Sequence, residues 1–430
     1  MSTILIKNGR IIDGTGKAPV ENASILIENG RFKEVAERDI EAPPRADVID
    51  ASGKTIIPGL IDMHAHLLSG GFDTITDVID SFDPETQKSA LRRMLYWGVT
   101  SLYNPVQPLE SGLRLRAQAV EGGLPSPRLF ISGPGFTAPD GWAGSLLPIA
   151  RMEPRDAHEA EQQVSRLADA GVDILKIYYD TQCCAFVNPL PKMERAILER
   201  IIEKAHARGM KVMVHAYDTQ YHKDALRAGA DILAHSAVTA PVDDEYIELA
   251  RRNRALYLAT LSVYHDAFDE KELRGFMACD FVQKTVPKKT LDSLAEGGPL
   301  DGFLKITRKD YIKGQLPTIQ ANLRRVFESG IRIGVGPDTG VMGAFPGISV
   351  HREMELMAQA GIPPAQVLVA ATSTAAEFLG EESLGSIERG KAADAVIIEG
   401  DTLQDIRNTR NIVLVIKDGR VIDREALLRD

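Results

Sequence analysis

The stretch Pro58-Gly59-Leu60-Ile61-Asp62-Met63-His64-Ala65-His66 decides how the rest of the chain is interpreted. Its pattern indicates a short apolar strand that ends in two histidines. Because side chains alternate across a strand, His64 and His66 lie on the same face. Two neutral imidazole nitrogens side by side suit a borderline divalent metal such as zinc. A His-x-His pair alone is weak evidence, so the remaining ligands must come from elsewhere in the chain.

The bulk composition is that of an ordinary globular protein. The chain has 430 residues, of which 44% are hydrophobic and 26% charged, and this length allows one barrel with a small accessory domain or two medium domains. The formal net charge of −10 argues against a nucleic-acid partner. The N-terminal sequence has no basic segment followed by a long apolar one, and no apolar run is long enough to span a bilayer. We therefore expect a cytoplasmic protein with no membrane partner.

The cysteines give no sign of a disulfide framework or of a thiolate metal site. They are odd in number and show no C-x-x-C spacing. Free thiols are the expectation for Cys183, Cys184 and Cys279.

Both ends of the chain carry the same local pattern, in which apolar runs are joined by Asn-Gly or Asp-Gly. The pattern occurs at 4–10, at 25–31 and again at 415–422. It favours hairpins with two-residue turns, because both turn residues must accept a positive φ. Since neither end has enough strands for a stable core, we expect 1–57 and 381–430 to form one small β domain, a β-sandwich. Two unrelated hairpins are the alternative.

Between the two ends, from 58 to 380, apolar strands alternate with helices. Apolar spacing predicts helices around 157–168 and 196–205, followed by Gly171 and Gly209 in the left-handed conformation that often ends a helix. Continuous apolar strands that alternate with helices are typical of a parallel sheet, and eight such units predict an α/β fold of the (β/α)8 TIM barrel type. An open doubly wound sheet is the alternative. The eight runs are the strand ending at His64, 99–103, 128–132, 172–177, 211–214, 232–234, 256–261 and 331–335.

An insertion at about 264–315 separates the seventh strand from the last helix and strand. Its lysine-rich stretches are typical of a solvated face. In a barrel enzyme, however, the loops after the strands build the active site, so the same segment is also placed to cap a pocket. The sequence leaves both interpretations open.

Four of the buried strands are followed by an ionisable residue, at the rim where barrel enzymes carry their active sites. Each of these alone is more often a satisfied polar group than a functional one. Together with His64 and His66 they make a ligand set suited to a hard-to-borderline divalent metal. The four residues are Lys176, His215, His235 and Asp338.

With the closing segment 384–398, these residues resemble the amidohydrolase superfamily in its binuclear, carboxylated-lysine branch. The sequence is most similar to the imidazolonepropionase-related and metal-dependent dipeptidase-like amidohydrolases, over nearly the whole chain. The resemblance implies two divalent metal ions, with zinc the first expectation. It implies that His64, His66 and Asp338 hold one ion, that His215 and His235 hold the other, and that Lys176, as a carbamate formed with carbon dioxide, bridges the two.

Such a site suits the hydrolysis of an amide. An ammonium group has no lone pair, whereas a carbamylated lysine is an anion that offsets the charge of two metals. Two metals can share one hydroxide, lower its pKa and polarise a substrate carbonyl. Asp338 is then placed to take the proton of the hydroxide and to deliver it to the leaving nitrogen. We expect cleavage of a C–N bond in a small amide, such as a dipeptide or an N-acyl amino acid.

Four further residues are candidates for substrate contact. Tyr178 and Tyr217 lie two residues beyond Lys176 and His215 on the same strand faces, where a hydroxyl can donate to an oxyanion. Packing at the barrel mouth is the alternative. His265, just beyond the seventh strand, and Trp142, in the loop after the third, are weaker candidates.

Other functions stay open at this point. A lactam or another cyclic amide is an alternative substrate. A mononuclear deaminase of a heterocycle is an alternative enzyme, against which Lys176 argues, and a non-catalytic scaffold is a third, against which the six filled ligand positions argue. The exact substrate, the native metal and a homo-oligomeric state cannot be read from the sequence, because the loops that shape a pocket vary within one fold.

Overall fold

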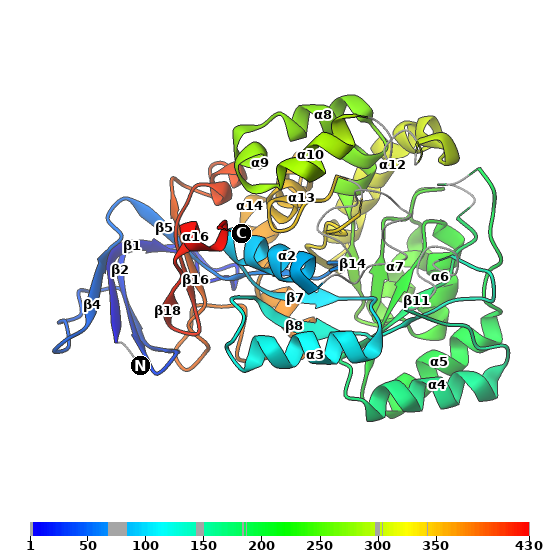
Figure 1. Ribbon diagram of the computed structural model, residues 1–430, viewed down its shortest axis with the longest axis horizontal. Coiled ribbons are helices and arrows are strands. Elements are labelled where there is room, and N and C mark those ends of the chain that lie inside the picture. Colours follow the sequence, from blue (N-terminus) through cyan, green and yellow to red (C-terminus); the bar gives the residue numbers. More distant parts are fainter. Residues whose placement is uncertain are drawn as a thin grey trace.

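The computed structural model describes residues 3–67, 84–142, 150–182, 185, 187–296, 302, 304–341 and 343–429. A sheet made from both ends of the chain stands beside a larger body in which helices surround parallel strands (Figure 1).

The sheet from the chain ends has eight strands in the order β18-β17-β16-β5-β1-β2-β3, with β4 paired to β1. The antiparallel pairing of β16 with β5 joins the C-terminal part of the sheet to the N-terminal part. The hydrogen bonds define one sheet and not two facing sheets, so the β-sandwich and the domain boundaries stay predictions. The strands are β1 (Ile4–Ile11), β2 (Val20–Glu28), β3 (Arg31–Ala36), β4 (Asp47–Asp50), β5 (Lys54–Pro58), β16 (Ala395–Glu399), β17 (Ile412–Lys417) and β18 (Arg420–Val421).

The Asn-Gly and Asp-Gly pairs of this sheet have two different roles. Asn29-Gly30 joins β2 to β3, Asp418-Gly419 joins β17 to β18, and all four residues have the positive φ that these hairpin turns require. The hairpin predicted at Asn8-Gly9 is wrong, because this pair lies inside β1 at a shift in its register with β2. A Cβ atom on Gly9 would lie 2.4 Å from Cδ1 of Ile56. The glycine therefore serves the close approach of β5 at a bulge rather than a turn.

The middle of the chain forms two parallel sheets in a TIM-barrel-like arrangement. Their orders are β6-β7-β8 and β10-β9-β11-β12-β13-β14-β15. Each of the eight predicted apolar runs contributes a strand, and the short strands β9 and β10 are additional. The strands are β6 (Leu60–Asp62), β7 (Val99–Asn104), β8 (Arg128–Ile131), β9 (Gly135–Phe136), β10 (Arg151–Met152), β11 (Ile174–Tyr178), β12 (Lys211–His215), β13 (Ile232–Ala234), β14 (Leu256–Leu258) and β15 (Arg332–Gly334).

Backbone hydrogen bonds connect the two parallel sheets at both junctions. The amide of Asp173 donates to the carbonyl of Ile131 at 2.8 Å, and the amide of Met63 donates to the carbonyl of Val335 at 2.9 Å. The strand ladders remain two, so a closed eight-stranded barrel stays a prediction. The second junction brings the end of β6 beside the end of β15, where the first candidate ligands lie.

Helices cover the outer side of the parallel strands (Figure 1). The helices predicted around 157–168 and 196–205 are α4 (Ala157–Asp169) and α5 (Arg195–Ala207), and Gly171 and Gly209 follow them with φ of +74° and +71°. Within the described part of the chain, no helix combines the length and the apolar character needed to cross a bilayer. Among the described residues, the other helices that lie wholly or mostly outside the insertion are α2 (Pro84–Tyr96), α3 (Leu109–Val120), α6 (Thr219–Ala228), α7 (Asp244–Arg252), α12 (Lys309–Glu328), α13 (Ile348–Gln359), α14 (Pro364–Ala370), α15 (Ser373–Leu379), the 3₁₀-helix η2 (Ile406–Arg410) and α16 (Arg424–Leu427).

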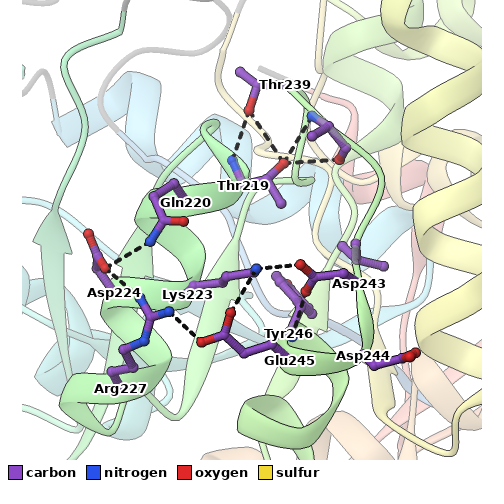
Figure 2. A network of polar contacts seen from close by, with 12 residues as sticks. Thr219, Gln220, Lys223, Asp224, Arg227, Thr239, Asp243, Asp244, Glu245 and Tyr246 are labelled. Carbon is purple, nitrogen blue, oxygen red and sulfur yellow. Dashed lines mark hydrogen bonds and ion pairs between the residues drawn. The ribbon is translucent and has the colours of Figure 1, made fainter.

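A network of charged side chains joins α6 to α7 (Figure 2). Lys223 on α6 pairs with Asp243 and Glu245, and Arg227 pairs with Asp224 and Glu245. Asp243 also caps α7, because its carboxylate accepts the backbone N–H of Tyr246 at 2.9 Å. These two helices follow β12 and β13, which carry two of the candidate ligands.

The insertion predicted at about 264–315 is largely helical. It contains most of the π-helix η1 (Val263–Ala267) together with α8 (Glu270–Met277), α9 (Asp280–Thr285) and α10 (Lys288–Ala295). Near its end, the amide of Val187 donates to the carbonyl of Ile306 at 3.1 Å, and the amide of Arg308 donates to the carbonyl of Ala185 at 2.8 Å. The insertion thus contacts the loop after β11, while its role as a cap stays a prediction. Cys279 in the insertion is a free thiol, as predicted, and Cys183 and Cys184 lie outside the described residues.

Candidate metal centre

Three of the predicted ligands converge where β6 and β15 end. Asp338 Oδ1 lies 2.9 Å from Nε2 of His66 and 3.2 Å from Nε2 of His64. One ligand atom from each of the three residues lies within 4.8 Å of the others, and all three side chains are buried. The predicted set His64, His66 and Asp338 therefore meets at one point.

Asp62 holds this convergence together. Its carboxylate accepts the backbone N–H of His64 at 2.9 Å and the hydroxyl of Thr339 at 2.8 Å, so it ties β6 to the residue after Asp338. Burial raises the pKa of Asp62 to about 7. Sequence reasoning assigned no role to Asp62, although strand alternation places it on the face shared by His64 and His66.

A second group of ligands lies beside the first. Nε2 of His235 is 2.9 Å from Nδ1 of His215 and 3.9 Å from Oδ2 of Asp338. Nζ of Lys176 is 3.1 Å from Nε2 of His64. The ring centroids of His64 and His235 are 5.0 Å apart. Asp338 and the His64 ring therefore contact both groups, and all six predicted ligands lie in one cluster.

Burial sets the protonation states in this cluster. It lowers the pKa of Lys176 to about 7, which makes the neutral amine accessible near neutral pH. Burial also holds the pKa values of His64, His215 and His235 well below the usual value for histidine. The three imidazoles are therefore neutral and offer lone pairs.

This donor set fits a divalent cation. Lone pairs of neutral imidazoles and of a carboxylate repel one another when they converge, unless a cation or a proton lies among them. Histidine nitrogen and aspartate oxygen are ligands that zinc commonly takes. The residues thus suit the group that the resemblance implies, whereas the number of ions, their identity and the carbamate stay predictions.

The two predicted tyrosines lie against the second group of ligands. The ring centroid of Tyr217 is 4.9 Å from that of His215 and 5.2 Å from that of His235. The ring centroid of Tyr178 is 5.2 Å from that of His215. Burial raises the pKa of Tyr178 far above its usual value, so its hydroxyl keeps its proton. Their contact with substrate stays a prediction.

Trp142 and His265 have different surroundings. The Trp142 ring lies 6.3 Å from that of His215, with 25° between the ring planes. Nδ1 of His265 lies 2.9 Å from Oδ1 of Asp266 and 3.3 Å from Nη2 of Arg352. Trp142 is therefore brought to the histidine cluster, while the described contacts of His265 belong to an ionic cluster with α13.

Two residues beyond β11 belong to the site and were missed from the sequence. The carboxylate of Asp180 accepts the backbone N–H groups of Gln182, at 2.6 Å, and of Tyr217, and burial raises the pKa of Asp180 to about 6. The side-chain amide of Gln182 contacts Nε2 of His215. The available signal was their spacing, which continues the series of every second residue from Lys176.

Comparisons with known proteins give the relationship of the whole chain. The model of the Amidohydrolase family matches residues 55–422. A dihydroorotase of Geobacter sulfurreducens is 43% identical over 76 residues, which are 18% of this chain and only 17% of that relative's length. The imidazolonepropionase of Geobacillus kaustophilus is 25% identical over 423 residues, covering 94% of this chain and 90% of that protein.

A solved structure extends the comparison to the fold. The structure of a Xaa-Pro dipeptidase with bound methionine in the active site superposes with a TM-score of 0.78 at 23% identity, covering 98% of this chain and 100% of that one. This likeness reaches both the parallel strands and the sheet from the chain ends. Since the family match also spans most of the sequence, the chain belongs to the amidohydrolase family.

Proposed function

We propose that this protein is a hydrolase that uses two divalent metal ions, zinc in the first place, to cleave the C–N bond of a small amide. The observation that carries the proposal is the meeting of all six predicted ligands in one buried cluster. Family membership supports hydrolysis, and the donor set supports metal dependence. Dipeptides and N-acyl amino acids are the proposed substrates, with a cyclic amide as the alternative.

His64, His66 and Asp338 would hold one ion, and His215 and His235 the other. Lys176 is completely buried 3.1 Å from His64 Nε2, where an ammonium group has no ligating lone pair. In a carbamate, the neutral amine bonds to the carbon of carbon dioxide and releases a proton. The resulting carboxylate-like anion can bridge two cations.

Side chains of this site would transfer the proton, stabilise the developing negative charge and face the substrate. Bound divalent cations lower the pKa of water and polarise a carbonyl group. Asp338 would take a proton from the attacking water and pass it to the leaving nitrogen. The hydroxyls of Tyr217 and Tyr178 would donate to the carbonyl oxygen as it gains negative charge, and Trp142 would form part of the substrate-facing wall.

The first test is elemental analysis of protein purified without chelators, together with its intact mass under native conditions. About two divalent ions per chain and the added mass of one carbon dioxide would support the proposal. About one ion and no added mass would favour the mononuclear deaminase, and ammonia release would then be assayed. Xaa-Pro dipeptides head the substrate screen because of the structural neighbour, followed by N-acyl amino acids and cyclic amides.

Asp338→Asn tests the proton transfer. Asparagine fills the same space and still offers an oxygen ligand, but it cannot take up the proton. We expect a folded protein whose kcat falls roughly 10²–10⁴-fold. Asp169→Asn, on a carboxylate that is 71% exposed at the end of α4, is the control. Near-normal turnover of Asp338→Asn at full metal content would remove the general-base assignment.

Lys176→Ala tests the carbamate. We expect loss of metal and of activity, with partial rescue by short carboxylic acids that replace the missing anion. Lys192→Ala is the control, because Lys192 Nζ lies over the Tyr179 ring at 3.8 Å, outside the ligand cluster. Two metals at full occupancy in Lys176→Ala would count against a carbamate on this residue.

A further inference from the structure

Among the contacts described above, His215 is the one candidate histidine ligand whose two ring nitrogens both have a partner. Nδ1 faces Nε2 of His235 at 2.9 Å, and Nε2 faces the side-chain amide of Gln182. His215 is 2% exposed and Gln182 is fully buried. Water therefore has little access to either contact, and the partners of the ring decide which nitrogen carries its single proton.

The two tautomers of His215 have opposite consequences for a metal. With the proton on Nδ1, that nitrogen donates to His235, and Nε2 accepts an N–H of Gln182; no lone pair of His215 is then left for a cation. With the proton on Nε2, the ring donates to an amide oxygen, and the lone pair of Nδ1 faces His235 Nε2. The second tautomer alone makes the pair His215 and His235 a ligand pair.

An amide side chain can serve both tautomers. The oxygen and the NH₂ group of glutamine exchange places when the amide turns by 180° about its last bond. Oε1 of Gln182 is buried and has no hydrogen-bond partner among the described residues, so the oxygen lacks a bond that the turn would provide. The proton moves from Nδ1 to Nε2 of the same ring, so the net charge is unchanged.

The backbone of Gln182 is held firmly by two hydrogen bonds. Its N–H donates to Asp180 at 2.6 Å, its carbonyl accepts from the amide of Ala185 at 3.1 Å, and its φ is +58°. Asp180 also accepts the backbone N–H of Tyr217, two residues after His215. One carboxylate thus fixes both the loop that carries Gln182 and the end of β12.

We propose that Gln182 is a positioning residue that sets the tautomer of His215: it donates to Nε2 without metal and, after its amide turns, accepts from Nε2 when His215 binds the second ion. This inference rests on the two-metal site proposed above. Outer-shell partners of metal-ligating histidines commonly change metal affinity by roughly 10–100-fold.

Gln182→Met and Gln182→Glu separate hydrogen bonding from packing. Methionine has similar length but makes no comparable hydrogen bond, so we expect the Kd of the second zinc ion to rise roughly 10–100-fold while the first is unaffected. Glutamate can accept from Nε2–H and is expected to keep second-site affinity near that of the wild type. Gln162→Met is the matched control, because Gln162 Nε2 makes the same kind of contact, 2.9 Å from His158 Nε2, on the exposed side of α4.

The readouts are zinc titration against a competing chelator and the nitrogen NMR shifts of His215. In the wild type we expect the protonated nitrogen to be Nδ1 without zinc and Nε2 with two zinc ions. An unchanged tautomer, an unchanged second-site Kd in Gln182→Met, or equal weakening in Gln182→Met and Gln182→Glu would overturn the inference. Should Gln182→Met fail to fold, the tautomer in the wild type still decides. A wild type that takes up no second ion would instead overturn the proposed two-metal function.

Discussion

Gly340 shows how one residue allows the ligands to meet. Its φ is +92°, and a Cβ atom there would lie 2.2 Å from the carbonyl oxygen of His66. Nearby, the amide of His66 donates to the carbonyl of Thr339 at 2.6 Å. A second glycine, Gly336, similarly leaves room for His64, because its added Cβ would lie 2.9 Å from that of His64. The end of β15 can approach the two histidines only because these side chains are missing.

We expect Gly340→Ala to lower the free energy of unfolding by roughly 2–4 kcal/mol, because it combines an unfavourable φ with a backbone clash. Its zinc content should fall as well, since His66 must shift. Gly330→Ala is the control, since Gly330 has φ of +74° with nothing within 4 Å of its added Cβ, and about 1–2 kcal/mol is expected there. Urea unfolding and metal analysis check both variants. Equal losses of unfolding free energy in the two variants would show that the clash with His66 does not contribute.

At the scale of elements, the strand ends supply the ligands and the following helices fix those ends. α6 and α7 follow the strands that carry His215 and His235, and the network in Figure 2 joins them through Lys223 and Arg227. On the inner side of α6, His222 lies 2.8 Å from the carbonyl of Ala216 and 3.0 Å from the hydroxyl of Tyr246 on α7. His222 therefore connects α6 both to α7 and to the residue that follows β12.

Asp243→Ala should destabilise this helix pair. The variant loses the N-cap of α7, worth about 1 kcal/mol, and a partly exposed ion pair worth about 0–1 kcal/mol. Asp244→Ala is the control, because the neighbouring Asp244 is fully exposed and loses only its pair with Arg325. Thermal unfolding should separate the two variants, with turnover unchanged in both. A Tm for Asp243→Ala equal to that of Asp244→Ala would contradict the capping role.

At the scale of the molecule, buried and partly buried polar contacts join the C-terminal segment to the parallel-strand body. His351 on α13 lies 3.0 Å from the hydroxyl of Thr409 in η2 and 2.9 Å from the carbonyl of Trp97, just after α2. Arg424 on α16 donates to the carbonyl of Tyr96 at 2.9 Å. Burial lowers the pKa of His351 to about 3, so the ring is neutral in the folded protein.

This lowered pKa predicts acid sensitivity. Below pH 6.5, the pKa of histidine in the unfolded chain, His351 is protonated in the unfolded state. In the folded protein it stays neutral down to its folded pKa of about 3, so stability is lost as pH falls from 6.5 to about 3. In His351→Gln the slope of unfolding free energy against pH should be shallower by up to about 1.4 kcal/mol per pH unit. Urea unfolding between pH 7 and pH 4 measures it, and identical slopes would contradict the prediction.

His206→Gln is the control, because folding raises the pKa of His206 whereas it lowers that of His351. Asp231 accepts a hydrogen bond from His206 and raises the pKa of this histidine above 6.5. The stability that it contributes is complete below the unfolded pKa and is lost as pH rises through the folded pKa. The slope of unfolding free energy against pH should therefore differ between this variant and the wild type above about pH 6.5, whereas in the acid window the two slopes should be equal.

Much of the fold and of the candidate site could be predicted because the signals are local. Apolar spacing indicated α4 and α5, and apolar runs ending in one polar residue indicated His215, His235 and Asp338. The prediction at Asn8-Gly9 was wrong because a positive φ at Asn8 suits a bulge as well as a hairpin turn, and pairing with the neighbouring strand chooses between them. For Gln182 the every-second-residue spacing from Lys176 indicated only a strand face, and it could not indicate the partner His215, which is 33 residues away.

Local sequence patterns were enough to predict which residues stand at the strand ends and on which face, because alternation and helical spacing act between near neighbours. It also carried enough of the family pattern to predict the amidohydrolase relationship. Packing of distant segments was needed to establish which strand ends meet, that Asp62 ties β6 to Thr339, and that Gln182 reaches His215. Such contacts join residues far apart in the chain, and a local pattern specifies a face but not the partner packed against it.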